Sequence, residues 1–183
     1  SSASVDVDPH RVQVAIPDDF EMPEGGLNIR WPDDALEQES RLHRFKIPAA
    51  QAYARANRLD RVVWDSPNAR IGVVASGKTW LDVLQAFEDL GLTEADAARI
   101  GLRLYKVAMV WPLEPEGLRR FADGLDQVIV VEEKRSFIES QIKEHMYNWP
   151  EADRGSHTRP SIVGKYNEQG DWILPFTQLQ TLF

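Results

Sequence analysis

The chain has 183 residues, of which 43% are hydrophobic and 27% are charged, with a formal net charge of -8 and a pI of about 5.0. An acidic chain without a basic cluster argues against nucleic acid as a partner, because phosphate binding requires a basic footprint. The absence of cysteine excludes disulfides, thiolate catalysis and iron–sulfur ligation by this chain, and it is compatible with a cytoplasmic location. No stretch reaches the ~18 apolar residues of a membrane helix, so we expect no membrane partner.

The first 61 residues predict an N-terminal arm with linker helices. In residues 12–16, Val12, Val14 and Ile16 alternate with smaller or polar residues, which predicts a short strand. Residues 18–32 are rich in proline, glycine and acids and predict an extended linker. Two helices are expected at 35–46 and 48–58, with a proline interrupting them. The first residues contain neither an initiator methionine nor a signal-peptide pattern, so we expect a piece cut from a longer protein.

An α/β domain is expected over residues 62–183. A buried strand at 71–75 leads through a tight turn into a helix that Thr79 and Asp82 can cap and that ends at Gly91. Strand, polar turn and helix in this order form half of a βαβ unit.

The clearest such unit follows later in the chain. Residues 127–131 form an apolar run of β-branched side chains, as in a central parallel strand. Four charged residues come next, and the segment 136–139 has the form of a capping box, with Ser at the N-cap and Glu three residues on. The apolar stripe of the following helix consists of Ile138, Ile142 and Met146.

Three strands alternate with three helices, because a strand at 102–107 and a helix at 115–123 lie between these two units. This pattern predicts a three-layer α/β fold, with a mainly parallel sheet, right-handed crossovers and helices on both faces. Short strands at 162–165 and 172–174 would add an edge. Ligands and partners of such sheets lie at the carboxyl ends of the strands, where we expect the functional residues.

One motif indicates a different class of protein. Residues 72–79 match the G-x-x-x-x-G-K-[ST] pattern of a phosphate-binding loop, and Glu132 stands where an acid would hold Mg²⁺. In a working loop of this kind the strand precedes the first glycine, whereas here residues 73–75 are the expected strand. The remaining three-residue turn is too short to surround a triphosphate. A small nucleotide-binding protein that uses Lys78, Thr79 and Glu132 stays open as an alternative.

Glu132 and Glu133 are adjacent carboxylates, and such pairs can perform acid–base chemistry or bind a metal. Neighbouring residues of a strand point to opposite faces, so we expect one of the two to act as a cap or to pair with Lys134, with Arg135 or with a neighbouring domain. The four histidines lack the spacing of a metal site. We therefore assign no catalytic, cofactor-binding or metal-binding residue.

Several long motifs occur in a fixed order along the chain. They are residues 55–61, residues 71–77, Leu104-Tyr105-Lys106-Val107-Ala108-Met109-Val110-Trp111-Pro112-Leu113-Glu114-Pro115, Val130-Val131-Glu132-Glu133-Lys134-Arg135, residues 138–143 and residues 159–165. Over about residues 45–175 the chain thereby resembles the transketolase C-terminal-like domain of 2-oxoacid:ferredoxin oxidoreductases. Within that family it is most similar to the indolepyruvate ferredoxin oxidoreductases.

The resemblance implies a role within a larger enzyme. Enzymes of that family oxidatively decarboxylate an arylpyruvate or related 2-oxoacid to an acyl-CoA and pass the electrons to ferredoxin. They use thiamine diphosphate, Mg²⁺, iron–sulfur clusters and coenzyme A. This chain has no cysteine and no acidic thiamine-binding motif, so we expect a non-catalytic, architectural domain of a homodimeric parent enzyme.

The strand-end residues are expected to face other domains or subunits of that parent enzyme. The residues of this expected contact are Ser76, Gly77, Lys78, Trp111, Pro112, Glu132, Glu133, Lys134 and Arg135. A second alternative is a stand-alone interaction domain whose acidic arm, residues 18–40, binds a partner.

Overall fold

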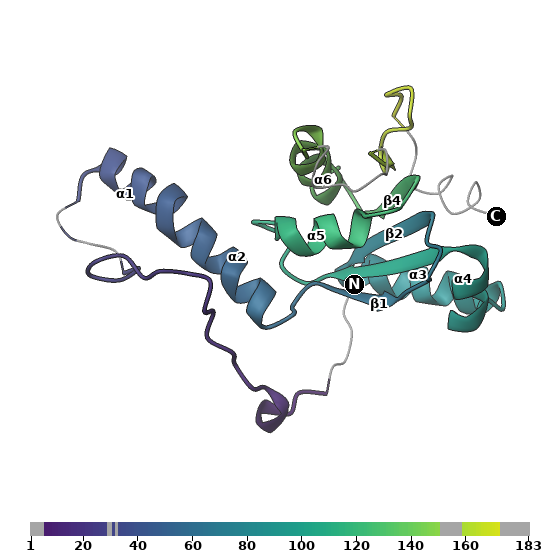
Figure 1. Ribbon diagram of the computed structural model, residues 1–183, viewed down its shortest axis with the longest axis horizontal. Coiled ribbons are helices and arrows are strands. Elements are labelled where there is room, and N and C mark those ends of the chain that lie inside the picture. The colour runs from purple at the N-terminus through teal and green to yellow at the C-terminus, as the bar shows by residue number, and fades with distance from the viewer. Residues whose placement is uncertain (1–5, 29–30, 32, 151–158, 173–183) are drawn as a thin grey trace. The chain divides into compact units, whose positions relative to one another are not determined.

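The chain divides into two compact units, Ser1–Leu59 and Asp60–Phe183, in a computed structural model that describes residues 6–28, 31, 33–150 and 159–172 (Figure 1). The sheet belongs to the second unit, and the first unit is extended and helical. Among the described residues, no helix is both long and apolar enough to cross a membrane.

The helices of the first unit follow one another without a break. They are α1 (Ala35–Arg41), the π-helical turn η2 (Leu42–Lys46) and α2 (Ile47–Ala56), and the short 3-10 helix η1 (Pro9–Arg11) precedes them. Asp34 and Glu37 form a capping box at the start of α1. Pro48 lies in the first turn of α2, a position that tolerates proline. The expected interruption at this residue is therefore wrong.

Residues 12–16 form no strand among the described residues, contrary to the sequence prediction. Their backbone is extended at Val12, with φ -86° and ψ 106°. A strand also needs a neighbour for its N–H and C=O groups, and no strand of the described arm lies beside this segment. The extended backbone is thus present at Val12, and the predicted strand is wrong.

The second unit is an α/β domain built on one five-stranded sheet. Its elements are β1 (Arg61–Trp64), β2 (Ile71–Ser76), α3 (Gly77–Asp89), α4 (Glu94–Ile100), β3 (Leu102–Val107), α5 (Pro115–Ala122), β4 (Gln127–Val131), α6 (Ile138–Tyr147) and β5 (Ser161–Val163). The strand order is β1-β3-β2-β4-β5, in which β1 is antiparallel to β3 and the other pairs are parallel. The predicted α/β fold with a mainly parallel sheet is confirmed.

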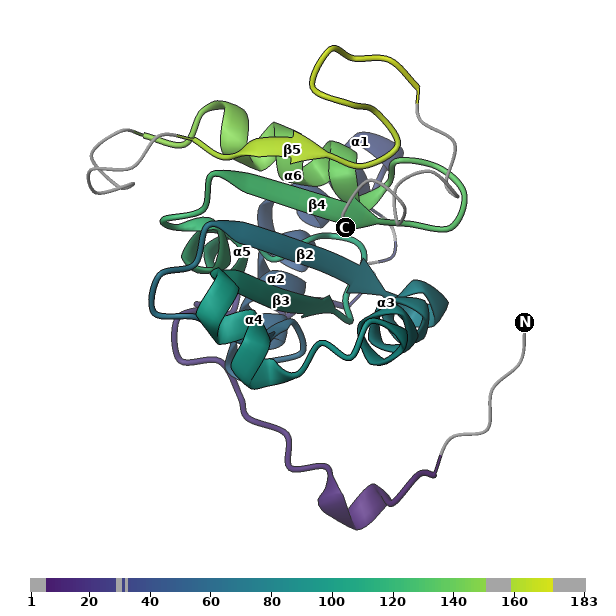
Figure 2. The ribbon, with the colours of Figure 1, turned by 90° about the vertical axis from the view of Figure 1, so that its right-hand side faces the viewer.

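Helices cover both faces of this sheet, and Figure 2 shows β5, β4, β2 and β3 stacked in that order. Successive residues of a strand point to opposite faces. Val128 and Val130 of β4 accordingly pack with α5 and α6, while Ile129 and Val131 pack with α3 and α4. The apolar run that the sequence analysis placed in a central strand is buried on both faces.

The edges of the sheet differ in part from the prediction. β1 was not predicted, because it has only four residues and they show no alternation of apolar and polar side chains. β5 confirms the strand expected near 162–165. Trp172 forms only an isolated bridge with Tyr166, and residues 173–174 of that expected strand lie outside the described residues.

Candidate functional site

The carboxyl end of β2 does not form a phosphate-binding loop. Gly72 lies inside β2, and α3 begins at Gly77, directly after the strand, so no loop of N–H groups surrounds an open space. A Cβ atom on Gly72 would lie 2.5 Å from side-chain atoms of Leu125 and Phe121. Close packing under α5 therefore explains the first glycine of the motif without a nucleotide.

The remaining side chains of the motif make contacts within the domain. Lys78 Nζ donates to both carboxylate oxygens of Asp82, at 2.7 and 2.6 Å. Thr79 Oγ1 lies 2.8 Å from the carbonyl oxygens of both Ser76 and Val131. The hydroxyl thus joins the ends of β2 and β4, and the prediction that Thr79 caps α3 is wrong.

Asp60 anchors the loop that follows β3. Its Oδ1 accepts hydrogen bonds from the backbone N–H groups of Ala108, at 2.7 Å, and Met109, at 3.0 Å. Burial raises the pKa of Asp60, against the effect of these two donors. The second oxygen of Asp60 and the phenolic oxygen of Tyr105 are buried, and neither has a hydrogen-bond partner among the described residues. Burial, together with the charges of Asp60 and Glu114, raises the pKa of Tyr105, so the phenol stays protonated at neutral pH.

Gln141 of α6 connects this loop to the loop after β4. Its side-chain oxygen accepts from the N–H of Leu113 at 3.0 Å, and its amide nitrogen donates to the carbonyl oxygen of Val110 at 2.8 Å. The same nitrogen lies 3.2 Å from the carbonyl oxygen of Phe137. One amide therefore fixes both loops, and the half-exposed Trp111 follows Val110 directly.

Glu132 caps α6 from outside the helix. Its carboxylate accepts from the N–H groups of Phe137, at 3.0 Å, Ile138, at 2.6 Å, and Glu139, at 3.0 Å. These are N–H groups that have no partner within a helix. The predicted capping box with Ser136 is therefore wrong, whereas the expectation that one glutamate of the pair caps the helix is confirmed. Burial raises the pKa of Glu132, and the three donors act against this rise.

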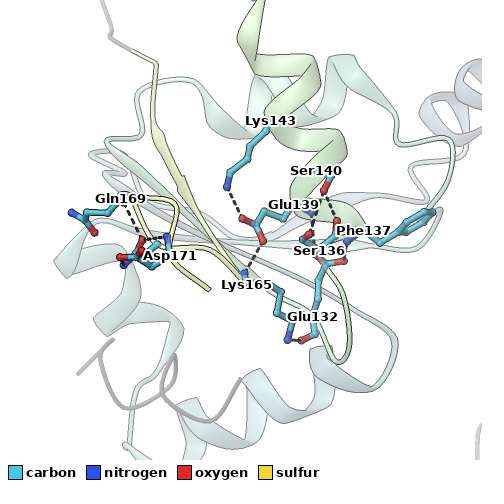
Figure 3. A network of polar contacts seen from close by, with 10 residues as sticks. Glu132, Ser136, Phe137, Glu139, Ser140, Lys143, Lys165, Gln169 and Asp171 are labelled. Atoms are coloured by element: carbon cyan, nitrogen blue, oxygen red, sulfur yellow. Dashed lines mark hydrogen bonds and ion pairs between the residues drawn. The ribbon is translucent and has the colours of Figure 1, made fainter. Parts of the chain in front are cut away.

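A second polar network lies beside this cap (Figure 3). The buried Glu139 accepts from the backbone N–H of Lys165 and from Lys143 Nζ, both at 2.6 Å. Gly164 allows the close approach, since a Cβ atom there would lie 2.4 Å from Glu139 Oε2. The buried Lys165 ammonium donates to the carbonyl oxygen of Glu132, at the end of β4. Burial lowers the pKa of Lys165, and the surrounding glutamates oppose this shift.

The residues of the expected contact lie at or after the carboxyl ends of β2, β3 and β4, but their exposure differs. Ser76, Pro112 and Glu132 are half-buried, and the exposed members are Gly77, Lys78, Trp111, Glu133, Lys134 and Arg135. Phe137, which the sequence analysis did not select, is half-exposed, and its ring points away from the network in Figure 3. The polar groups nearest the sheet thus form hydrogen bonds within the domain, whereas the exposed residues of the expected contact and Phe137 face outward.

Comparison with known proteins places the chain in a family. The family model described as the indolepyruvate oxidoreductase domain matches residues 61–180, well over half of the chain. The chain belongs to the indolepyruvate oxidoreductase domain family. Among curated proteins, the indolepyruvate oxidoreductase subunit IorA of Thermococcus kodakarensis is 28% identical over 81 residues, which are 44% of this chain and 11% of that protein.

Two solved structures are similar to this indolepyruvate oxidoreductase domain. The 2-oxoglutarate:ferredoxin oxidoreductase of Magnetococcus marinus has 16% identity and a TM-score of 0.49, over 89% of this chain and 25% of that one. A split-gene transketolase, an inactive β4 tetramer, has 21% identity and a TM-score of 0.41, over 57% and 31%. The chain spans about a tenth of the length of the curated relative and less than a third of either structure.

The motifs of the family domain have identifiable structural tasks. Glu132 caps α6, Gly164 makes room for Glu139, and Lys165 bonds to the end of β4. The described residues contain no group of three His, Cys, Asp or Glu side chains that could hold a metal ion, and the chain has no cysteine. The side chains present therefore do not fit an iron–sulfur cluster.

Proposed function

We propose that this chain is a structural and assembly domain, without catalytic groups of its own, of a cytoplasmic, thiamine diphosphate-dependent indolepyruvate ferredoxin oxidoreductase. The family membership and the small share of the relative that the chain spans support a role as one part of a larger enzyme. That enzyme would oxidise an arylpyruvate or related 2-oxoacid to an acyl-CoA and pass the electrons to ferredoxin.

The observation that carries the proposal is the internal use of the polar groups at the strand ends. A catalytic acid, base or metal ligand must reach a substrate. The charged groups of Glu132, Glu139 and Lys165 instead form hydrogen bonds with backbone groups of the same domain. Their removal would unfold this edge rather than stop a chemical step.

The outward-facing residues at the same edge suit a protein interface. Val110, Trp111 and Phe137 are 40%, 53% and 50% exposed, respectively, on two loops that the Gln141 amide joins. The exposed charges of residues 133–135 lie next to Phe137 in the chain. Large exposed apolar side chains with a charged rim are typical of protein–protein contacts.

The cofactors of the parent enzyme would lie outside this chain. Thiamine diphosphate with Mg²⁺ would supply the decarboxylation chemistry, and iron–sulfur clusters would carry the electrons to ferredoxin. We place these groups and coenzyme A in other domains or subunits of a homodimeric enzyme; for the clusters and Mg²⁺, the described side chains offer neither cysteine ligands nor a three-ligand metal site.

The test compares Phe137→Asp and Trp111→Asp in the complete parent enzyme. A buried charge in the interface should reduce the fraction of assembled enzyme and its ferredoxin-reducing activity by about tenfold or more, because an unpaired charge there is not compensated. The same substitutions in the 183-residue chain should change its thermal midpoint little, since both side chains are half-exposed.

Leu90→Asp is the matched control. Leu90 is 51% exposed and follows α3 at the end opposite to its start beside β2. It should leave assembly and activity unchanged. Full assembly of the Phe137→Asp and Trp111→Asp enzymes would refute the proposed interface, and a loss of assembly with Leu90→Asp would show that the effect is not specific to this edge.

A further inference from the structure

The side chain of Gln141, on α6, holds both ends of the bend formed by Trp111 and Pro112. Its oxygen accepts from the N–H of Leu113 at 3.0 Å, and its nitrogen donates to the carbonyl oxygen of Val110 at 2.8 Å. The two bonded backbone groups lie immediately before and after the bend. One side chain therefore fixes the loop after β3 against α6.

The same amide also bonds to the loop after β4. Its nitrogen lies 3.2 Å from the carbonyl oxygen of Phe137, the residue that precedes α6. A primary amide offers one acceptor oxygen and two N–H donors, which matches the one donor and two acceptors that the loops present. A carboxylate cannot donate, and an apolar side chain can neither donate nor accept. The three bonds therefore depend on the amide of Gln141.

Carboxylates anchor each of the two loops at another point. Asp60 accepts from the N–H groups of Ala108, at 2.7 Å, and Met109, at 3.0 Å, at the start of the first loop. Glu132 accepts from the N–H of Phe137, at 3.0 Å, at the end of the second loop. A change at either anchor can therefore reach the other loop through the amide between them.

We infer that Gln141 is a latch that makes the two loops open and close as one unit. When the first loop moves away from α6, the amide loses Val110 and Leu113 and no longer fixes Phe137. While the latch is closed, the half-exposed Trp111 and Phe137 keep one arrangement relative to each other. This inference concerns the chain itself and does not require the proposed function.

The test is a double-mutant cycle that is measured by amide hydrogen exchange at single-residue resolution in the 183-residue chain. Asp60→Ala removes the acceptor at the start of the first loop. It should speed exchange of the Phe137 amide, on the other loop, by about fivefold or more. In a Gln141→Leu background the same substitution should change Phe137 exchange by less than about twofold, because the link between the loops is absent.

A second perturbation and two controls accompany the cycle. Ala108→Gly loosens the first loop at an exposed residue and should give a smaller effect in the same direction. Tyr147→Leu is the matched control for Gln141→Leu, since Tyr147 is 73% exposed on the same helix, and the effect of Asp60→Ala should persist in it. The Val74 amide, in the central strand β2, reports unfolding of the whole domain, so faster exchange of Phe137 counts only where it exceeds the change at Val74.

Unchanged exchange of Phe137 in both the Asp60→Ala and the Ala108→Gly chains would overturn the inference, because the loops would then move independently. Equal acceleration in the native and Gln141→Leu backgrounds would also overturn it, since the coupling would then bypass the amide. Neither result bears on the proposed function. Its failure has a different readout, namely full assembly of the Phe137→Asp and Trp111→Asp enzymes.

Discussion

Gly164→Ala should destabilise the domain through Glu139 rather than through the backbone. The new methyl group would lie 2.4 Å from Oε2, 2.7 Å from Cδ and 3.1 Å from Cγ of Glu139, so this carboxylate must move. It would then lose its bond to the N–H of Lys165 while remaining buried. A hydrogen bond to a charged group contributes about 2 kcal/mol. With a urea m-value of about 2 kcal/mol/M, the unfolding midpoint should fall by about 1 M.

A double-mutant cycle tests the cause of this loss. In a Glu139→Ala background the methyl group introduced at position 164 has room, so adding Gly164→Ala should cost little and the two substitutions should couple by about 2 kcal/mol. Gly77→Ala is the control: its φ of 55° gives a backbone cost of about 1 kcal/mol that does not depend on Glu139. Equal costs of Gly164→Ala in both backgrounds would refute this reasoning.

Three further predictions concern buried or motif residues. Burial raises the pKa of Asp60, so the stability that its protonated form contributes is complete below the unfolded pKa near 3.8 and is lost as pH rises through the folded pKa. Asp60→Asn does not titrate, so in urea unfolding this variant should gain stability relative to the native chain between about pH 4 and pH 7. A relative loss of stability over this range would contradict the prediction. Lys78→Ala should change the free energy of unfolding by less than about 0.5 kcal/mol, because Lys78 forms an exposed ion pair with Asp82. Calorimetry should detect no binding of Mg-ATP to the native chain. Saturable binding that Lys78→Ala abolishes would instead favour the nucleotide-binding alternative. Thr79→Val should cost about 1 kcal/mol in urea unfolding, because the hydroxyl bonds to carbonyls of two strands, and a neutral result would show that these bonds add nothing.

The sheet and its buried helices could be predicted because they follow from local patterns. Residues 127–131 read as a strand buried on both faces, and Ile138, Ile142 and Met146 are all buried, as their helical spacing predicts. Helical spacing is less informative in α3, where Leu81 and Leu90 are apolar and are nevertheless about half-exposed.

The polar contacts could not be predicted, because they join residues that are distant in sequence or reverse a local rule. The cap of α6 comes from Glu132, six residues before Ile138, whereas a capping box is sought within four residues. Glu139 and Lys165 are buried, whereas glutamate and lysine side chains usually lie at the surface, so their sequence gives no sign of burial. Gly164 next to Lys165 was the only local signal, since a glycine at a strand end often marks the close approach of another group.

The most direct test of the central claim is the size and cofactor content of the native assembly that contains this sequence. An antibody raised against the 183-residue chain would isolate it from the source cells. The proposed function predicts an assembly far larger than 20.8 kDa that contains iron and thiamine diphosphate. A free polypeptide of about 20.8 kDa without iron or thiamine diphosphate would contradict it.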